Sequence, residues 1–254
     1  HKTRWPLIRR AIGLIVLGLL HSTFIWEGDI LLFYGGLLFL LLFFLYRKPK
    51  TLFIWSGILF ILTIGLSIGE NVDLFDPEKA AEYVKEEYAV FSSGTYEEIK
   101  DFRLNSELPF DGDELTVAIL AFVIIFIAPI MFLPMFLLGM AFAKINLFSA
   151  PQDERKIYRR MSYFVVVGLV LKTIGQLDFS FSDFVYVIGG PLLALGYIGA
   201  LSLLYNTQVG RKYSEAFANV GKLSLTNYLM QSVIFTFIFY GYGLGLFGSV
   251  GPTI

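Results

Sequence analysis

Seven long apolar runs divide the chain, and most approach the length that an α-helix needs to cross a bilayer. They cover residues 8–26, 30–46, 51–69, 115–143, 161–177, 184–205 and 223–247. About 20 residues at a rise of ~1.5 Å each span ~30 Å of hydrocarbon. The fourth run is long and contains Pro129 and Pro134, which predict a bend because proline removes a helix hydrogen bond. The pattern predicts an all-α fold, a polytopic integral membrane bundle of about seven transmembrane helices.

A polar, acidic stretch separates the third run from the fourth. Asp76 followed by Pro77 is typical of a helix start, and Thr95 followed by Glu98 has the spacing of a capping box. These signals predict two short helices over residues 77–90 and 96–104, with a solvated acidic loop as the alternative. The chain is therefore interpreted as three helices in 1–69, an acidic segment in 70–114, and four helices in 115–254.

Composition supports a lipid environment. The 254 residues are 56% hydrophobic and only 16% charged, whereas a soluble domain carries roughly 25% charged residues. There are no cysteines and only two histidines, so neither a disulfide framework nor a metal site is expected. The expected partner is the lipid bilayer, with a small-molecule or lipid ligand possible and no nucleic acid; the oligomeric state is not indicated.

Charge predicts the orientation of the chain in the membrane. Of the 20 lysine and arginine residues, 15 lie in four segments of the chain. These are the N-terminal segment through Arg10 and the loops 47–50, 144–160 and 206–222. These segments share one side if seven helices alternate, and the positive-inside rule makes that side cytoplasmic. The segment 70–114, with fourteen acids against four bases, then lies outside. We expect a multi-pass protein of the cell membrane with the amino end of this chain in the cytoplasm.

One histidine lies within the first apolar run. His21 is five residues before Trp26, so it lies roughly 7 to 8 Å below the outer boundary. Ionisable residues inside membrane spans usually face a bundle interior or a wet cavity. Glu27 and Asp29 follow at the outer mouth and could orient the imidazole, which makes these three residues catalytic candidates. The alternative is a structural histidine bonded to a hydroxyl or carbonyl of a neighbouring helix.

Polar side chains in two later runs are candidates for lining a cavity. Lys172 and Gln176 share a helical face with Gly168, although a lysine at this depth can also extend to the surface. The last run carries a polar stripe whose alternative role is hydrogen bonding between helices. Its candidates are Asn227, Tyr228, Gln231 and Ser232. No phosphate-binding loop, nucleophile elbow or metalloprotease motif occurs in a plausible context.

Three stretches resemble the YeiB-like family of bacterial integral membrane proteins. They read RRAIGLIVLGLLHSTFIWEGDILLFYGGL, SSGTYEEIKDFR and NVGKLSLTNYLMQSVIFTFIFYGYGLGLFG. Within the last, the words LTNYLMQS and GYGLGLFG are the most specific. Family members usually begin with an additional helical region and continue with further helices after the GLGLFG word. The chain is therefore expected to be the middle of a larger bundle.

The resemblance leaves two function classes open. The family is placed by similarity with transmembrane acyltransferases, which implies transfer of an acyl group from cytoplasmic acyl-CoA to an extracytoplasmic acceptor. In such enzymes a membrane histidine can act as base or acyl acceptor; His21 is the chemical candidate for that part and is not matched to a family motif. Arg9, Arg10, Arg159 and Arg160 would then face the acyl-CoA, the cofactor in this case. The alternative is a transporter or a small-molecule or lipid-binding membrane protein without catalysis.

Overall fold

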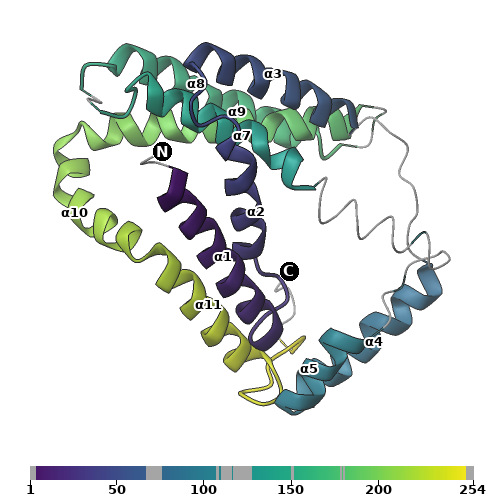
Figure 1. Ribbon diagram of the computed structural model, residues 1–254. Helices are drawn as coiled ribbons and strands as arrows, with labels where there is room; N and C mark the ends of the chain where they lie inside the picture. The colour runs from purple at the N-terminus through teal and green to yellow at the C-terminus, as the bar shows by residue number, and fades with distance from the viewer. Residues whose placement is uncertain are drawn as a thin grey trace. The chain divides into compact units, whose positions relative to one another are not determined.

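The computed structural model of the protein describes residues 4–66, 76–106, 109, 116, 128–149, 152–177, 179 and 181–249. All regular elements in these residues are α-helices (Figure 1). They are α1 (Arg4–Phe24), α2 (Leu31–Leu42), α3 (Pro49–Leu66), α4 (Pro77–Ser93), α5 (Tyr96–Asn105), α7 (Ala128–Lys144), α8 (Arg155–Ile174), α9 (Ser182–Tyr205), α10 (Gln208–Lys222) and α11 (Ser224–Phe239). The prediction of an all-α fold is confirmed.

The helices fall into two compact units. The first contains the described residues of His1–Phe39, Val72–Ile127 and Leu223–Ile254, and the second those of Leu40–Asn71 and Ala128–Lys222. The first unit therefore holds α1, α4, α5 and α11, whereas the second holds α3 and α7 to α10. Each unit is described by itself below.

The predicted runs correspond to helices, with one addition. Of the run 115–143, residues 115 and 117–127 lie outside the described part of the chain. Pro134 lies inside α7, and the bend at Pro129 and Pro134 stays a prediction. The interpretation of residues 206–222 as a loop was wrong, because α10 occupies most of them. This helix is amphipathic, and its apolar stripe is exposed at Val209, Tyr213, Phe217 and Val220.

The two helices predicted in the acidic segment are confirmed, together with their caps. Asp76 accepts the backbone N–H groups of Glu78 and Lys79 at the start of α4. Thr95 and Glu98 form the reciprocal capping box of α5. Hydrogen bonds from Thr95, first from its backbone N–H and then from its hydroxyl, lower the pKa of the Glu98 carboxyl. The box is therefore complete at neutral pH and is lost only as the pH falls through that lowered value.

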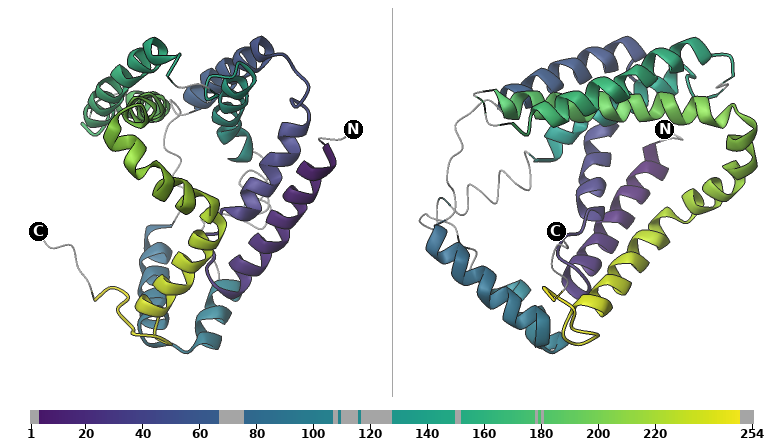
Figure 2. Two further views of the ribbon diagram at one scale, coloured as in Figure 1. Left: turned by 90° about the vertical axis from the view of Figure 1, so that its left-hand side faces the viewer. Right: turned by 180° about the vertical axis from the view of Figure 1, so that it is seen from behind.

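Glycines let α8 and α9 pack closely in the second unit, where they form the most extensive helix pair (Figure 2). Gly168 of α8 and three glycines of α9, Gly189, Gly196 and Gly199, are buried. A Cβ built on Gly168 would lie 2.7 Å from the Leu193 backbone nitrogen. Small residues at such a contact let two backbones approach, which is a common way for helices to associate in lipid.

An aromatic cluster joins α4 and α5 to the segment after α11 in the first unit. Phe91 of α4 is 3% exposed and packs on Tyr240, with ring centroids 4.8 Å apart. Gly241 follows, and its N–H donates to the Phe91 carbonyl across 2.8 Å. A Cβ on Gly241 would approach the backbone of Gly94 to 2.6 Å. The glycine-rich word after α11 thus fits the chain against the end of α4.

Two of the described helices are long and apolar enough to span a bilayer, namely α1 and α9. The other apolar helices, α2, α3, α7 and α11, have shorter apolar segments by the same measure. This composition points to association with a membrane. Seven spans and the orientation of the amino end remain predictions.

Candidate functional site

His21 and Asp29 form a buried pair at the end of α1. The His21 Nδ1 atom lies 2.9 Å from Asp29 Oδ1, and the two side chains are 1% and 2% exposed. Tyr228 of α11 joins them: its hydroxyl donates to the same carboxylate oxygen across 3.2 Å. The Tyr228 and His21 rings also touch, with centroids 5.3 Å apart. Three groups from two distant parts of the sequence therefore meet within one unit.

The turn between α1 and α2 carries Asp29 back over the first helix. Asp29 Oδ2 accepts the backbone N–H of Leu32 at 2.8 Å, so the carboxylate also caps the first turn of α2. Gly18, nearly one turn before His21, leaves the necessary room. A Cβ at Gly18 would lie 2.6 Å from Asp29 Oδ2. The close approach of the carboxylate thus depends on a residue without a side chain.

The hydrogen bonds assign the proton positions of the pair. The Tyr228 hydroxyl accepts the Ile30 N–H across 3.1 Å, so its own proton is free to point at Asp29. The carboxylate, an acceptor when ionised, then requires a donor at His21 Nδ1. A neutral His21 therefore presents Nε2 as an acceptor. Nε2 is buried and has no hydrogen-bond partner within the described structure.

A carboxylate that bonds one nitrogen of an imidazole is an arrangement in which the imidazole can act as a base. The carboxylate fixes the tautomer and stabilises the imidazolium once a proton has been taken up. A neutral imidazole in this state accepts a proton at Nε2, and because Nε2 is buried, the group that gives the proton would have to enter the interior of this unit.

Glu27, the other acidic candidate, has a different partner. It lies 3.5 Å from Nη1 of Arg103 on α5, and its side chain is 47% exposed. The structure therefore does not bring Glu27 to the histidine.

Arg103 is a residue that the sequence analysis did not identify. Its Nη1 donates to the Ile25 carbonyl at 2.7 Å, and its Nη2 to the Thr23 carbonyl at 3.0 Å. Tyr96, also on α5, donates its hydroxyl to the Phe24 carbonyl at 2.9 Å. These carbonyls end α1 and have no partners inside the helix, and a cation at this end also complements the helix dipole. The end of α1, and with it the start of the turn to Asp29, is therefore held by α5.

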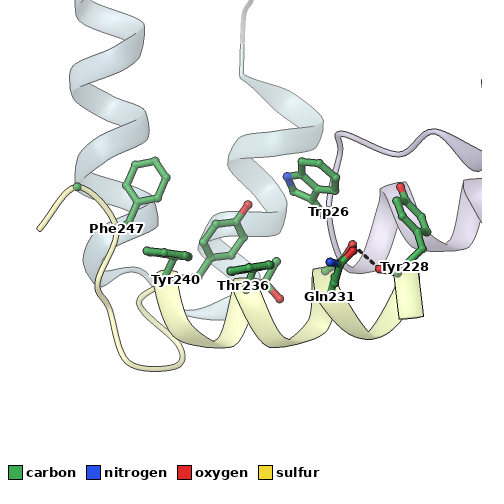
Figure 3. A pocket seen from close by; sticks show the side chains of 10 residues that line it. Trp26, Tyr228, Gln231, Thr236, Tyr240 and Phe247 are labelled. Atoms are coloured by element: carbon green, nitrogen blue, oxygen red, sulfur yellow. Dashed lines mark hydrogen bonds between the residues drawn. The ribbon is translucent and has the colours of Figure 1, made fainter. Parts of the chain in front are cut away.

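A cavity of ≈ 550 Å³ runs along α11 in the same unit. In Figure 3 the side chains of Tyr228, Gln231, Thr236 and Tyr240 project from the helix on the side of Trp26. Ser232, Phe235, Phe239, Phe247 and Gly248 complete the lining. Three polar candidates from the sequence thus line it: Tyr228, Gln231 and Ser232. Asn227, on the same helix, is exposed and is not among the lining residues.

The remaining candidates lie apart from this group. Lys172 and Gln176 belong to the second unit. The Lys172 ammonium lies 3.4 Å from the centroid of the Tyr186 ring, a cation–π contact, whereas Gln176 is exposed. Arg9 and Arg10 are exposed on α1, and Arg159 and Arg160 on α8 of the second unit. No group of metal-ligating side chains occurs in the part of the chain that the structure describes.

Comparisons with known proteins give the family. Residues 142–254 match the family described as a protein of unknown function, DUF418. Uncharacterized protein YxaH of Bacillus subtilis (strain 168) is 36% identical over 256 residues, covering 96% of this chain and 61% of YxaH. Uncharacterized protein YeiB of Escherichia coli (strain K12) is 28% identical over 266 residues, covering 95% of this chain and 64% of YeiB.

The similarity extends over nearly the whole chain, and the chain spans about three fifths of the length of both relatives. No solved structure matches. The YeiB-like resemblance of the sequence words and these matches agree, and the chain belongs to the YeiB-like DUF418 family.

Proposed function

We propose that the chain belongs to a multi-pass membrane acyltransferase in which His21 is the general base. The observation that carries the proposal is the buried pair: Nδ1 of His21 lies 2.9 Å from Asp29 Oδ1, and Nε2 has no hydrogen-bond partner among the described residues. In the proposed step a hydroxyl or amine of the acceptor attacks the thioester carbonyl of an acyl-CoA. The new C–O or C–N bond forms, the C–S bond breaks, and the acceptor proton passes through Nε2 to the thiolate of coenzyme A.

The position of the arginines on α1 is compatible with such a donor. Arg9 and Arg10 precede His21 by about three helical turns, roughly 17 Å along the axis. An extended pantetheine arm covers a distance of this order. Phosphates held by exposed guanidinium groups would thus leave the thioester within reach of the histidine.

Replacing His21 tests the function directly. Asparagine can still donate a hydrogen bond to Asp29, but it has no counterpart of Nε2. We expect His21→Asn to reduce acyl transfer by about 10²- to 10⁴-fold, measured as acyl-CoA turnover by purified protein, with a melting temperature close to that of the wild type.

Ser22→Ala is the matched control, since the Ser22 hydroxyl bonds only to the Leu19 carbonyl of its own helix. This variant should keep the wild-type rate. Full activity of His21→Asn would contradict the role of His21. A wild type that neither binds nor hydrolyses any acyl-CoA would instead favour the transporter or ligand-binding alternative.

The proposed topology has seven membrane spans, with the amino end of the chain in the cytoplasm and α4 and α5 outside. The natural absence of cysteine allows single cysteines to be introduced without further changes. An impermeant thiol reagent added to intact cells should label Lys85→Cys, which is exposed on α4, and should not label Gln152→Cys until the cells are opened. Labelling of Gln152→Cys from outside would reverse the orientation.

A further inference from the structure

Among the described residues that line the cavity along α11, no side chain is charged at neutral pH. Its ten described lining residues include six large aromatic side chains, at Trp26, Tyr228, Phe235, Phe239, Tyr240 and Phe247. A phosphate or carboxylate placed here would be stripped of water without a cation beside it, which costs far more than burying a neutral group. The lining therefore excludes the phosphates of coenzyme A and favours an uncharged ligand.

Polar side chains are concentrated at one end of the cavity. Tyr228 and Gln231 lie in the first half of α11 (Figure 3), Ser232 follows at its middle, and Tyr228 contacts Asp29 at this end. Phe235 and Phe239 follow and stack on each other, with ring centroids 6.1 Å apart. Tyr240 and Phe247, which contact the aromatic cluster around Phe91, form the other end. One end of the cavity offers an amide to a head group, and the other is mainly aromatic, with the hydroxyls of Thr236 and Tyr240 within it.

The polar end has a donor to offer to a ligand. The Ser232 hydroxyl bonds back to the Tyr228 carbonyl, and the Thr236 hydroxyl to the Val233 carbonyl, so neither hydroxyl proton is directed at a ligand. The Gln231 amide, which supplies both donors and an acceptor, is exposed to the cavity. A neutral amide can both donate to and accept from a hydroxyl group, whereas it supplies no charge to balance an ionic head group.

The shape of the cavity limits the apolar part of the ligand. From Tyr228 to Tyr240 the helix rises by roughly 18 Å. The cavity volume is ≈ 550 Å³, and a ligand that contacts the lining residues from Tyr228 to Tyr240 is therefore elongated, as an extended hydrocarbon chain is.

We propose that this cavity binds a single-chain amphiphile with an uncharged, hydroxyl-bearing head, the head at Gln231 and Tyr228 and the chain along Phe235 and Phe239. The role of this ligand as the acceptor of the acyl group rests on the proposed function. The binding of the ligand does not. The arrangement would present the hydroxyl on the side of the cavity where Tyr228 contacts His21.

Trp26 provides an intrinsic reporter of binding. The chain has three tryptophans, and Trp5 and Trp55 are 62% and 44% exposed, so both can be changed to phenylalanine to leave Trp26 alone. The protein is placed in phosphatidylcholine nanodiscs and titrated with a monoacylglycerol whose chain carries two bromine atoms. Bromine quenches only nearby indoles. We expect saturable quenching by this probe, beyond that caused by dibrominated phosphatidylcholine at the same molar fraction.

Two variants on α11 separate the cavity from the general lipid surface. Phe235 lines the cavity and Phe237 does not, although they are 53% and 55% exposed. Phe235→Ala should raise the half-saturating probe concentration about tenfold, equivalent to roughly 1.4 kcal/mol, whereas Phe237→Ala should leave it within about twofold. Melting temperatures verify that both variants are folded.

Several outcomes would overturn the proposal. These are quenching that rises linearly without saturation, equal quenching by the two-chain phospholipid, or equal effects of the two alanine variants. The titration contains no acyl donor, so it measures binding independently of transfer. A protein that binds the probe in the titration but transfers nothing when acyl-CoA is supplied contradicts the proposed function alone. A protein that acylates water-soluble acceptors and shows no saturable quenching contradicts the cavity proposal alone.

Discussion

Asp29→Asn is expected to lower acyl transfer about 10⁴-fold, the size of effect seen when the orienting carboxylate of a catalytic triad becomes an amide. The carboxylate accepts from His21 and Tyr228 at one oxygen and from the Leu32 N–H at the other. An asparagine has only one oxygen. If that oxygen stays with the Leu32 N–H, the amide NH₂ faces His21 and forces the imidazole proton onto Nε2. The base is then blocked by its own proton.

The tautomer can be observed without knowing the substrate. The chain contains only His1 and His21, so ¹⁵N NMR of protein labelled at histidine, with His1 replaced, reports on a single imidazole. The wild type should carry the proton on Nδ1 and Asp29→Asn on Nε2. Tyr228→Phe is the control: it removes one donor to Asp29 and keeps the contact with His21, so the wild-type tautomer should persist. A proton on Nε2 in the wild type would contradict the assignment.

The sequence pointed to the histidine but could not choose its partner. Glu27 and Asp29 stand two residues apart, and either could reach His21 by count alone. The choice depends on the turn after α1, where Asp29 folds back over Gly18 and Glu27 points to Arg103. A turn of this kind is set by contacts with α5 and α11, far along the sequence, which a local pattern does not contain.

Arg103 shows why some functional side chains escape sequence reasoning. It stands in an acidic segment, in the last turn of a short helix, where a basic residue is already explained by the dipole of its own helix. Its partners are the carbonyls of another helix, nearly 80 residues earlier. Backbone carbonyls are present at every residue, so no residue type marks them as acceptors.

Helix α10 was missed for a different reason. It lies between two apolar runs, and its glycines, asparagine and charges are typical of a loop. Yet Val209, Tyr213, Phe217 and Val220 follow at spacings of four, four and three residues, which is a helical stripe. The caps of α4 and α5 were found because capping depends on residues only two or three positions apart.

Arg103→Met should lower the free energy of unfolding by about 3 kcal/mol, since two hydrogen bonds from a charged donor to helix-end carbonyls are lost. The Arg103 side chain is 4% exposed, so water does not readily replace it at the Thr23 and Ile25 carbonyls. Its Nε atom has no hydrogen-bond partner among the described residues, an existing cost that limits the net loss. Denaturant titration in a mild detergent, monitored by circular dichroism, measures the change.

Glu27→Gln separates the helix-end contacts from the ion pair. Glu27 is about half exposed, and an exposed pair contributes less than about 1 kcal/mol, so this variant should stay close to the wild type. Hydrogen exchange should locate the effect of Arg103→Met: the amides of Ile25 and Trp26, which both donate to the His21 carbonyl, should exchange faster. Equal destabilisation by the two variants would show that Arg103 contributes to stability through its ion pair with Glu27 and not through its hydrogen bonds at the end of α1. Protection of these amides at the wild-type level would show that α1 ends in the same way without α5, and that the turn to Asp29 does not depend on Arg103.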